Sequence, residues 1–364
     1  MEITAAVLRE ARTPMTLETL ELDDPRAAEI VVEIAGCGIC HTDLTFRDGL
    51  WPYPMPAVLG HEGAGTVVSV GSAVRAVGVG DRVVMSFGFC GECPSCLSGD
   101  PASCANSPVI NMRGARADGS MTLSQHGNPV HGSFIMQSSF ATHVLTDERF
   151  VTKLPKSVPL ELAGTLGCGI PTGAGSVLNV LRPKPGSSVA VFGLGAVGLA
   201  AVAAAKFSGC TRIVGVDLNP GRLDLARHFG ITDVVDASSE GSVNAIHELV
   251  PGGVDGAIEA SGAKKALTDA FMSTAVTGTT VLVGAAPMGT RYEIDSAALL
   301  VGRTVRGCML GQANPRVFIP QLVQMWEQGL LPIEKMCTTF KLSDIEAAMA
   351  AAADGSVVKP VLIP

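Results

Sequence analysis

The sequence predicts an α/β protein with two domains, a partly open β-barrel and a doubly wound parallel sheet. Three observations lead to this prediction. The length of 364 residues suggests two domains. The first ninety residues contain short β-branched runs that end at Gly or Asp, which is typical of barrel strands. From Ser188 onward, strands alternate with helical patterns, which is typical of a parallel sheet covered by helices.

The composition indicates a globular enzyme and excludes several function classes. Apolar residues make up 47% of the chain and charged residues 16%, with 42 Gly, as in globular proteins with many tight turns. The net charge of −8 comes without a Lys/Arg cluster, so we expect no nucleic-acid partner. The apolar run Leu194–Ala205 is too short to cross a bilayer. Met1–Thr4 shows no basic and apolar leader, so we expect a cytoplasmic protein with no membrane partner.

In the barrel part we expect strands at Ala28–Ile34, Gly63–Val70 and Asp81–Met85. Residues 105–135 are polar and Gly-rich, which predicts a long surface loop. Ser138–Ala141 is expected to return to a strand, and a helix through Glu161–Leu166 is expected to end just before Cys168.

Two thiols and an imidazole form a candidate open metal site. Cys40, His61 and Cys168 lie in Gly-flanked segments, separated by 21 and 107 residues, so only the fold can bring them together. Two thiolates and an imidazole are the ligand set of a catalytic zinc that keeps its fourth position open. Asp43 is expected to orient His61, because a metal-bound imidazole usually donates its other N–H to a carboxylate or carbonyl. Alone, each of these residues would be an ordinary core residue.

The other cysteines divide into two groups. In a cytoplasmic chain, cysteines are better explained as metal ligands than as disulfides. Four thiols at intervals of 3, 3 and 8 residues predict a closed, tetrahedral structural zinc, with reactive or disulfide-bonded cysteines as the alternative: Cys90, Cys93, Cys96 and Cys104. The remaining four show no ligand spacing and are expected in the core: Cys37, Cys210, Cys308 and Cys337.

A dinucleotide-binding motif follows the first strand of the second domain. Val189–Phe192 is a continuous apolar run of the kind buried in parallel sheets. It leads directly into a G-x-G-x-x-G motif, with an Ala-rich helix after it: Gly193, Leu194, Gly195, Ala196, Val197 and Gly198. The motif alone is weak evidence, but a strand before it and a helix after it strengthen the prediction. A pyrophosphate is expected at the helix N-terminus, where free N–H groups favour an anion.

The next strand, Arg212–Val216, ends in Asp217, which lies 19 residues after Gly198. A carboxylate at this position accepts hydrogen bonds from the adenosine ribose and repels a 2′-phosphate, which favours NAD over NADP. The alternative is that Asp217 is only a turn residue at the strand end. Strands expected at Val254–Glu259 and Thr279–Gly284 complete the doubly wound sheet.

These motifs resemble those of the zinc-dependent alcohol dehydrogenases of the medium-chain dehydrogenase/reductase superfamily. The resemblance runs nearly end to end and is greatest to the aryl-alcohol (benzyl alcohol) dehydrogenases. It implies a GroES-like catalytic domain at residues 1–169 and 310–364 and an NAD-binding Rossmann domain at residues 170–309. It also implies a homodimer or homotetramer that assembles through residues 294–311. A helix at Ile345–Ala353 and a strand at Val357–Ile363 are expected to end the chain.

The resemblance also assigns coenzyme contacts. Arg222 is expected at the adenosine ribose and His41 at the pyrophosphate. Lys359 stands where the family has a basic pyrophosphate ligand, usually Arg, and it keeps the charge without the bidentate fork. The nicotinamide is expected to lie beside Thr172 and the backbone near Val283, Gly284 and Ala285.

The expected reaction interconverts a primary alcohol, aromatic or allylic, and its aldehyde, with hydride transfer between the alcohol carbon and NAD on a catalytic zinc. By resemblance Trp51 and Phe87 line the substrate pocket, with Phe46 close by, although ordinary core aromatics are the alternative. Glu62, which follows a zinc ligand, is expected either to approach the metal from behind or to be a buried structural carboxylate.

The relay of groups that carries the alcohol proton away is expected to be shorter than in many relatives. Many relatives carry the proton from the Thr or Ser beside the zinc ligand, through the nicotinamide ribose, to a His three residues further on. Here Thr42 occupies the first position but Thr45 the last, so the proton is expected to leave to His41 or directly to water. The alternative is that His41 only binds pyrophosphate.

Three other functions remain open at this stage. A glutathione-dependent formaldehyde dehydrogenase needs basic residues for the glutathione carboxylates. Pro108 stands where that family has its Arg, although Arg113 and Arg116 are nearby. Polyol dehydrogenases usually replace the third zinc ligand, Cys168 here, by Glu. A non-catalytic NAD-binding or zinc-stabilised protein would have no use for an open metal position.

Overall fold

The structure is a computed structural model that describes residues 1–239 and 241–364. The chain divides into two compact units. Unit 1 comprises Met1–Cys168, Asn314–Val323 and Met336–Pro364, and unit 2 comprises Gly169–Ala313 and Gln324–Lys335. The first division falls one residue from the expected boundary. Residues 324–335, however, group with unit 2, whereas we expected all residues from 310 onward to belong to the catalytic domain.

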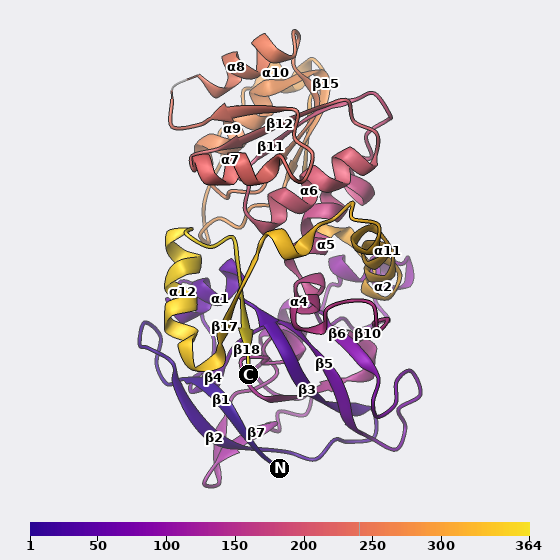
Figure 1. The fold of residues 1–364 in the computed structure, drawn as a ribbon, viewed down its shortest axis with the longest axis vertical. Coiled ribbons are helices and arrows are strands. Elements are labelled where there is room, and N and C mark those ends of the chain that lie inside the picture. Colours follow the sequence, from indigo (N-terminus) through magenta and orange to yellow (C-terminus); the bar gives the residue numbers. More distant parts are fainter. Residues whose placement is uncertain (240) are drawn as a thin grey trace. The chain divides into compact units, whose positions relative to one another are not determined.

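Unit 1 is built on two sheets (Figure 1). The smaller sheet has the strand order β4-β1-β2-β7-β8, with bounds Ala57–Val58, Glu2–Leu8, Thr16–Leu22, Leu123–Gln125 and Asn128–Val130. The larger sheet has the strand order β10-β6-β5-β3-β18-β17, and β9 also pairs with β3. In chain order its strands are β3 Glu29–Gly38, β5 Glu62–Val70, β6 Arg82–Met85, β9 His143–Asp147, β10 Val151–Lys153, β17 Cys337–Lys341 and β18 Lys359–Ile363. Together they form the curled, partly open barrel that the sequence predicted.

Short helices connect these strands. They are α1 His41–Arg47, α2 Pro94–Leu97, α3 Ser107–Met112, α4 Leu160–Ala163, the 3₁₀ turn η4 Gly164–Gly167 and α12 Ile345–Asp354. The longer α11, Pro315–Glu327, is shared between the two units. Helix α12 packs along β17 and β18, which are yellow in Figure 1.

Two local predictions were wrong. Residues 105–135 are not one surface loop, because they contain α3, β7 and β8, and three glycines with positive φ lie between these elements: Gly114, Gly119 and Gly127. Ser138–Ala141 is irregular, although Ala141 bridges Ala5 and β9 begins at His143. Ser138 has a φ of 65°, a left-handed conformation that lies outside the β region of a regular strand.

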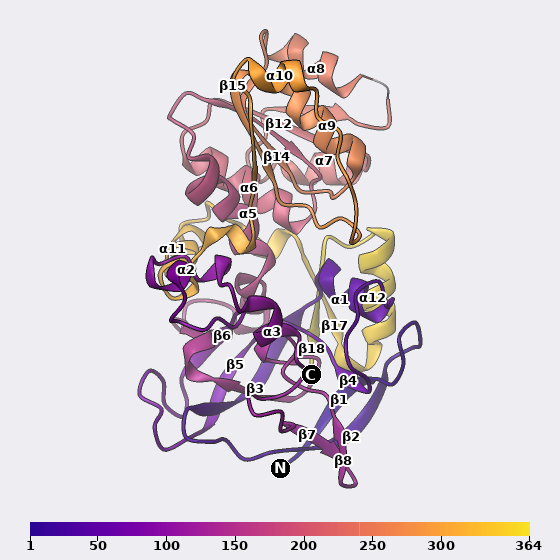
Figure 2. The ribbon, with the colours of Figure 1, turned by 180° about the vertical axis from the view of Figure 1, so that it is seen from behind.

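Unit 2 is a six-stranded parallel sheet with the order β13-β12-β11-β14-β15-β16 (Figure 2). The strands are β11 Ser188–Phe192, β12 Arg212–Asp217, β13 Asp233–Asp236, β14 Val254–Glu259, β15 Thr274–Leu282 and β16 Thr304–Gly307. The helices are α5 Gly169–Gly175, α6 Ala196–Phe207, α7 Pro220–Ala226, α8 Ser242–Leu249, α9 Lys264–Ser273 and α10 Ser296–Leu300. The strand order reverses between β11 and β14, and ligands of such sheets bind at the strand ends beside this point.

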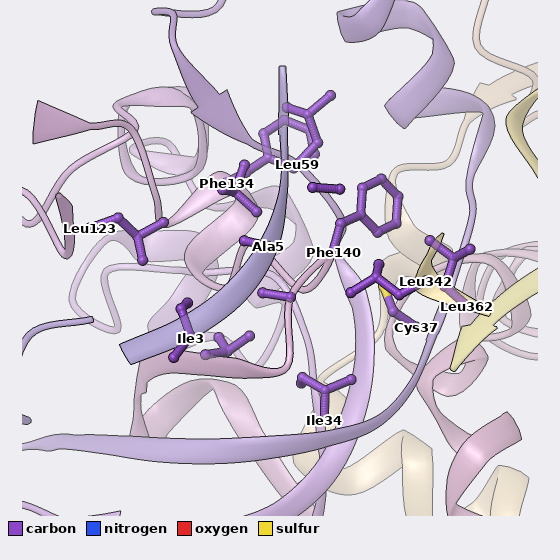
Figure 3. Close-up of a cluster of buried hydrophobic side chains, with 14 of the residues drawn as sticks. Ile3, Ala5, Ile34, Cys37, Leu59, Leu123, Phe134, Phe140, Leu342 and Leu362 are labelled. Carbon is purple, nitrogen blue, oxygen red and sulfur yellow. The ribbon is translucent and has the colours of Figure 1, made fainter. Parts of the chain in front are cut away.

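Each unit has its own hydrophobic core. In unit 1 the core joins both sheets, and Figure 3 shows Ile3, Leu59, Phe134, Phe140 and Leu362 gathered in it. In unit 2 the apolar residues of β11 and β12 are buried, as their unbroken Val and Ala runs predicted. Within the described parts of the chain, none of the helices is both long enough and apolar enough to cross a membrane.

Candidate active site and metal centres

Cys40, His61 and Cys168 come together in unit 1, as the sequence predicted. Cys40 caps the N-terminus of α1, His61 precedes β5 and Cys168 follows η4. Their ligand atoms and a carboxylate oxygen of Glu62 all lie within 4.8 Å of one another. Nε2 of His61 is buried and has no hydrogen-bond partner, as a ligand nitrogen aimed at a metal would be. Two sulfurs and one imidazole nitrogen therefore fit a zinc ion with one open position.

Asp43 holds this ligand set in place. Its Oδ1 lies 2.9 Å from Nδ1 of His61, and the carboxylate also accepts hydrogen bonds from the backbone N–H groups of Cys40 (2.9 Å) and Gly60 (3.2 Å). The Asp43 side chain is fully buried. Because a carboxylate only accepts, Nδ1 carries the proton and Nε2 is left to bind a metal. Asp43 thus orients two of the three ligands.

The ligand side chains compete for protons. The Cys168 thiol donates to the sulfur of Cys40, which is the main reason that the pKa of Cys40 lies well below its usual value. The same bond, together with burial, raises the pKa of Cys168. Burial alone would lower the pKa of His61, but Asp43 and Cys40 together raise it. Zinc must displace these protons, so its uptake is expected to release them.

Glu62 and Lys359 form a buried ion pair beside the ligands. Nζ of Lys359 lies 3.0 and 2.9 Å from the two carboxylate oxygens and also donates to the carbonyl of Ile39 at 3.0 Å. Burial raises the pKa of Glu62 and Lys359 opposes this effect, while the pKa of Lys359 is itself raised because its acceptors outweigh burial. All three ammonium donors are occupied, so Lys359 in this arrangement is not available to a pyrophosphate, contrary to expectation.

The expected relay residues lie on α1. The hydroxyl of Thr42 is 3.7 Å from the sulfur of Cys40, whereas the imidazole of His41 is exposed. Thr45 donates its hydroxyl to the carbonyl of His41 at 3.0 Å, so this hydroxyl is hydrogen-bonded within α1. Thr42 is therefore the hydroxyl beside the metal ligands.

The expected pocket aromatics have different environments. Phe46 is buried and makes edge-to-face contacts with Trp51, Tyr53 and Phe134, so it is a core residue rather than a pocket wall. Trp51 is half-buried at the edge of this cluster. Phe87 is buried elsewhere and contacts Phe89.

Phe134, which the sequence analysis did not single out, contacts His61 edge-to-face with ring centroids 5.6 Å apart. It was missed because the segment around it resembles a loop. In this cluster Phe46 and Phe134 are buried, whereas Trp51 and Tyr53 are half-buried and keep some exposed aromatic surface.

The four-cysteine set forms a second metal centre. The four ligand atoms of Cys90, Cys93, Cys96 and Cys104 lie within 4.8 Å of one another, and all four sulfurs come from the protein. The backbone N–H groups of Glu92 and Cys93 donate to Cys90 and lower its pKa to about 6. Thiolates held this way suit a closed tetrahedral zinc with no place for substrate.

The dinucleotide motif has the geometry that its glycines require. Gly193 has a φ of 87°, and a Cβ on Gly198 would lie 1.8 Å from the carbonyl oxygen of Gly193. Gly195 caps α6, and a Cβ there would meet nothing within 4 Å. Free N–H groups thus face open space at the start of a helix, which suits a pyrophosphate. Leu194 and Val197 complete this turn between β11 and α6.

Asp217 lies at the carboxyl end of β12, beside the motif. Its carboxylate accepts hydrogen bonds from the N–H groups of Leu194 (2.6 Å) and Asn219 (2.9 Å). Arg222 follows on α7 and is half-buried. Asp217 therefore both braces the phosphate turn and presents a negative charge there.

The remaining coenzyme candidates lie on other elements of unit 2. Thr172 is on α5, where the neighbouring Gly173 packs closely against the carbonyl of Val197. Val283 donates its N–H to the carbonyl of Glu259 at 2.9 Å, and Ala285 is exposed just beyond. Glu259 joins the ends of β14 and β15 and was missed because a carboxylate within a strand resembles an ordinary end residue.

The two arginines that could bind glutathione carboxylates, Arg113 and Arg116, already have hydrogen-bond partners within the protein. Arg116 is buried and pairs with Glu29 and Asp23, each at 2.7 Å. Arg113 donates to the carbonyl of Arg116. Neither arrangement favours the formaldehyde dehydrogenase alternative.

The fold and the site define a zinc-dependent alcohol dehydrogenase, and the chain belongs to this family, which uses a nicotinamide cofactor. An alcohol dehydrogenase GroES-like domain matches residues 26–156, and a zinc-binding dehydrogenase domain matches residues 196–328.

Individual relatives agree with this assignment. The geraniol dehydrogenase of Castellaniella defragrans is 39% identical over 99% of this chain and 97% of its own. The crystal structure of an alcohol dehydrogenase zinc-binding domain protein from Burkholderia ambifaria is 44% identical, with a TM-score of 0.98, and covers 100% and 99% of the two chains. Benzyl alcohol dehydrogenase from Acinetobacter calcoaceticus is 38% identical over the same shares, with a TM-score of 0.96.

Proposed function

We propose that the enzyme interconverts an apolar primary alcohol, aromatic or allylic, and its aldehyde with NAD. The observation that carries the reaction is the open ligand set of Cys40, His61 and Cys168, with Nε2 of His61 buried and unpartnered. The substrate class is supported by the half-buried ring of Trp51, at the edge of the aromatic cluster that reaches His61. It is also supported by two relatives, whose named substrates are an allylic and an aromatic primary alcohol.

The chain's residues have separate tasks in this reaction. A zinc ion on the three ligands would act as a Lewis acid that makes an alcohol hydroxyl easier to deprotonate. Asp43 keeps the imidazole in the tautomer that binds a metal. The hydroxyl of Thr42 lies beside the ligand sulfur and would accept the alcohol proton. NAD supplies the hydride acceptor, and the motif at Gly193–Gly198 would hold its pyrophosphate.

A panel of alcohols tests the reaction and the substrate class together. A phenyl ring buries on the order of 100 Å² more apolar area than a methyl group, or about 2.5 kcal/mol. We therefore expect kcat/KM for benzyl alcohol and geraniol, followed as NADH absorbance, to exceed that for ethanol at least about tenfold. Equal efficiency for ethanol would remove the basis for the substrate class. Failure of every alcohol with a fully zinc-loaded enzyme would contradict the function itself.

We also propose a shortened proton relay, from Thr42 through the nicotinamide ribose to His41 or to water. The exposed imidazole of His41 and the hydroxyl at Thr45 support it. Thr45→His restores an imidazole at the usual end of the relay. If proton release limits the chemical step, this change should raise the rate at low pH and add an ionisation to the pH profile. An unchanged profile, with normal turnover of His41→Gln at saturating NAD, would leave only coenzyme binding for His41.

We propose that residues 294–311 join two copies of the chain. They include β16, the outer strand of the unit 2 sheet, and several exposed apolar side chains: Leu299, Leu300, Val301 and Met309. An unpaired strand edge with apolar neighbours favours pairing with a second copy. Leu300→Asp should shift the mass measured by light scattering toward the monomer, whereas Leu97→Asp, at another exposed leucine that lies in unit 1, should not. A monomeric wild type would refute the interface.

We further propose that the enzyme acts in the cytoplasm. None of the ten cysteines forms a disulfide, and a reducing compartment keeps cysteines in this state. Cell fractionation would test this, and recovery in an oxidising compartment would contradict it.

A further inference from the structure

The segment Ser133–Ser139 encloses the metal ligand His61 and has no role in the reaction described above. Five of its seven residues are almost completely buried, in a part of the chain that resembles a loop: Ser133, Phe134, Gln137, Ser138 and Ser139. Figure 3 shows Phe134 of this segment beside Leu59, in the core of unit 1. A buried irregular segment is unusual, because its backbone polar groups must find partners away from water.

The backbone of this segment is strained. Four of its non-glycine residues have positive φ values of 57°, 48°, 62° and 65°: Ser133, Ile135, Met136 and Ser138. The left-handed region costs an L-residue about 1–2 kcal/mol, and a β-branched residue such as Ile135 is rarely found there. Such strain persists only where the surroundings over-determine the conformation, and it clusters at functional sites.

The contacts that hold the segment are made with the residues around His61. The side-chain amide of Gln137 donates to the carbonyl of His61 at 2.8 Å and accepts the N–H of Gly63 at 3.0 Å. Ser139 donates its N–H to the carbonyl of Gly60 and its hydroxyl to Oε1 of Gln137. Ser138 donates its hydroxyl to the carbonyl of Val58 at 2.7 Å. The segment therefore binds the chain on both sides of the metal ligand.

The ring of Phe134 completes this support. It contacts the imidazole of His61 edge-to-face, at an interplanar angle of 78°. Phe46 and Tyr53 pack edge-to-face against Phe134, with centroids 5.0 and 5.1 Å away. The imidazole is thus held by Asp43 at Nδ1 and by Phe134 at its ring, and its backbone is held by Gln137.

We propose that Gln137 is a positioning residue for the catalytic metal. By holding the carbonyl of His61 and the N–H of Gly63 with one amide, it fixes the peptide plane between His61 and Glu62 and the plane between Glu62 and Gly63. The proposal rests on the proposed zinc site at Cys40, His61 and Cys168. The hydrogen bonds of the Gln137 side chain to His61 and Gly63 hold the segment in its strained conformation.

Zinc retention distinguishes positioning from a merely structural role. Gln137→Met keeps the size of the side chain and removes both hydrogen bonds. Loss of an outer contact to a metal ligand typically weakens metal binding 10–100-fold. We expect Gln137→Met to lose one zinc per chain to a chelator at least about tenfold faster than wild type. Activity should fall at the same rate, because the zinc that is lost is the catalytic one.

Asn111→Leu is the matched control. Asn111 is a buried amide of the same unit that accepts the N–H of Gly88 at 2.7 Å and donates to the Gly88 carbonyl at 2.9 Å. Its loss should lower the melting temperature without faster loss of activity in the chelator. Gln137→Met with the same drop in melting temperature and a wild-type rate of zinc loss would overturn the proposal.

A second variant covers failure of the first to fold. Gln137→Glu keeps the acceptor for Gly63 and loses the donor to His61, so zinc loss should again be faster than in wild type, and a wild-type rate would overturn the proposal. A wild-type chain that binds only the structural zinc would instead refute the proposed metal site. A wild type with two zinc ions and unchanged variants would refute only the role of Gln137.

Discussion

Asp43 shows how one side chain organises a site that is distributed along the chain. Three buried N–H groups, from His61, Cys40 and Gly60, converge on its two oxygens. Only an ionised carboxylate accepts all three without presenting a donor of its own. The same chemistry makes the site sensitive to changes that barely alter shape.

Asp43→Asn tests this sensitivity. Its amide nitrogen must oppose at least one of the three N–H donors, and a buried unsatisfied donor costs about 1–3 kcal/mol. Zinc affinity and kcat/KM should fall about 10–100-fold while the chain stays folded. Metal analysis and steady-state kinetics measure both quantities. Asp48→Asn, at a partly exposed carboxylate at the end of the same helix, should leave both unchanged. Wild-type zinc affinity in Asp43→Asn would contradict the role of Asp43.

Asp217→Gly tests coenzyme choice. We expect Asp217 to face the adenosine ribose. Removing its negative charge should then raise the ratio of kcat/KM with NADP to that with NAD by about tenfold or more, since like charges at close range repel by several kcal/mol in a partly desolvated site. Asp224→Ala removes an exposed charge from the neighbouring helix and should leave the ratio unchanged. A wild type that prefers NADP would show that Asp217 does not select the coenzyme.

At the scale of elements, close backbone crossings bring the ligands together. The chain through α4 and η4, which ends at Cys168, lies directly against β3 and β5. A Cβ on Gly36 would be 2.0 Å from the carbonyl oxygen of Glu161, and a Cβ on Gly164 would be 2.0 Å from that of Glu62. These glycines let the segment before Cys168 approach β3, which ends shortly before Cys40, and β5, which begins just after His61.

Gly36→Ala should therefore destabilise unit 1. The added methyl group meets backbone that cannot move aside cheaply, and overpacking of this kind costs about 1–3 kcal/mol. The free energy of unfolding in urea measures the loss. Gly78→Ala, where the nearest atom would be 3.9 Å away, should change stability by less than about 0.5 kcal/mol. Equal stability of the two variants would mean that the crossing tolerates a side chain.

The sheet β1–β2–β7 carries a pH-dependent contribution. Arg9 donates to Glu18, and this bond lowers the pKa of Glu18 from 4.5 to about 2. A lowered carboxyl pKa stabilises the fold above the unfolded-state value, so the contribution is complete above about pH 5 and is lost as pH falls toward 2.

Glu18→Gln should lower the free energy of unfolding by about 1 kcal/mol near pH 6, a small value because the Arg9 side chain is 44% exposed. The difference between variant and wild type should shrink toward zero near pH 2, where acid-induced zinc loss affects both proteins alike. Urea titrations across this range measure it. A difference that is constant with pH would show that the ion pair does not stabilise the fold.

At the scale of the whole molecule, the two zinc sets have different tasks. One is closed by four sulfurs and the other leaves a position for substrate. Structural zinc contributes folding free energy directly, whereas the open set contributes chemistry.

Cys93→Ser should separate these tasks. The variant should lose one zinc per chain and melt at a lower temperature, while the folded fraction keeps its turnover. Cys40→Ser should lose the other zinc and all turnover while it remains folded. Cys210→Ser, at a half-buried thiol outside both sets, should retain two zinc ions. A folded, active wild type with a single zinc would contradict the assignment.

The sequence by itself determined the ligand residues and the coenzyme motif. The spacing of the four structural cysteines, the strand–glycine–helix pattern and the position of Asp217 are local in the chain. Cys40, His61 and Cys168 are far apart, and they were predicted from their residue types and from the family resemblance. The alternation of strands and helices likewise predicted the doubly wound sheet.

Only the tertiary structure decided which neighbours support the site. Lys359 lies 297 residues from Glu62 and Gln137 lies 76 residues from His61, and no local pattern links residues so far apart. Phe46 was expected near the substrate and is a core residue, because its burial depends on Phe134 and Tyr53 rather than on its own sequence context. The sequence of residues 133–138 resembles a loop, because their conformation is imposed by long-range hydrogen bonds rather than by a local pattern. Local propensity describes one segment at a time, whereas packing and buried hydrogen bonds are satisfied between segments.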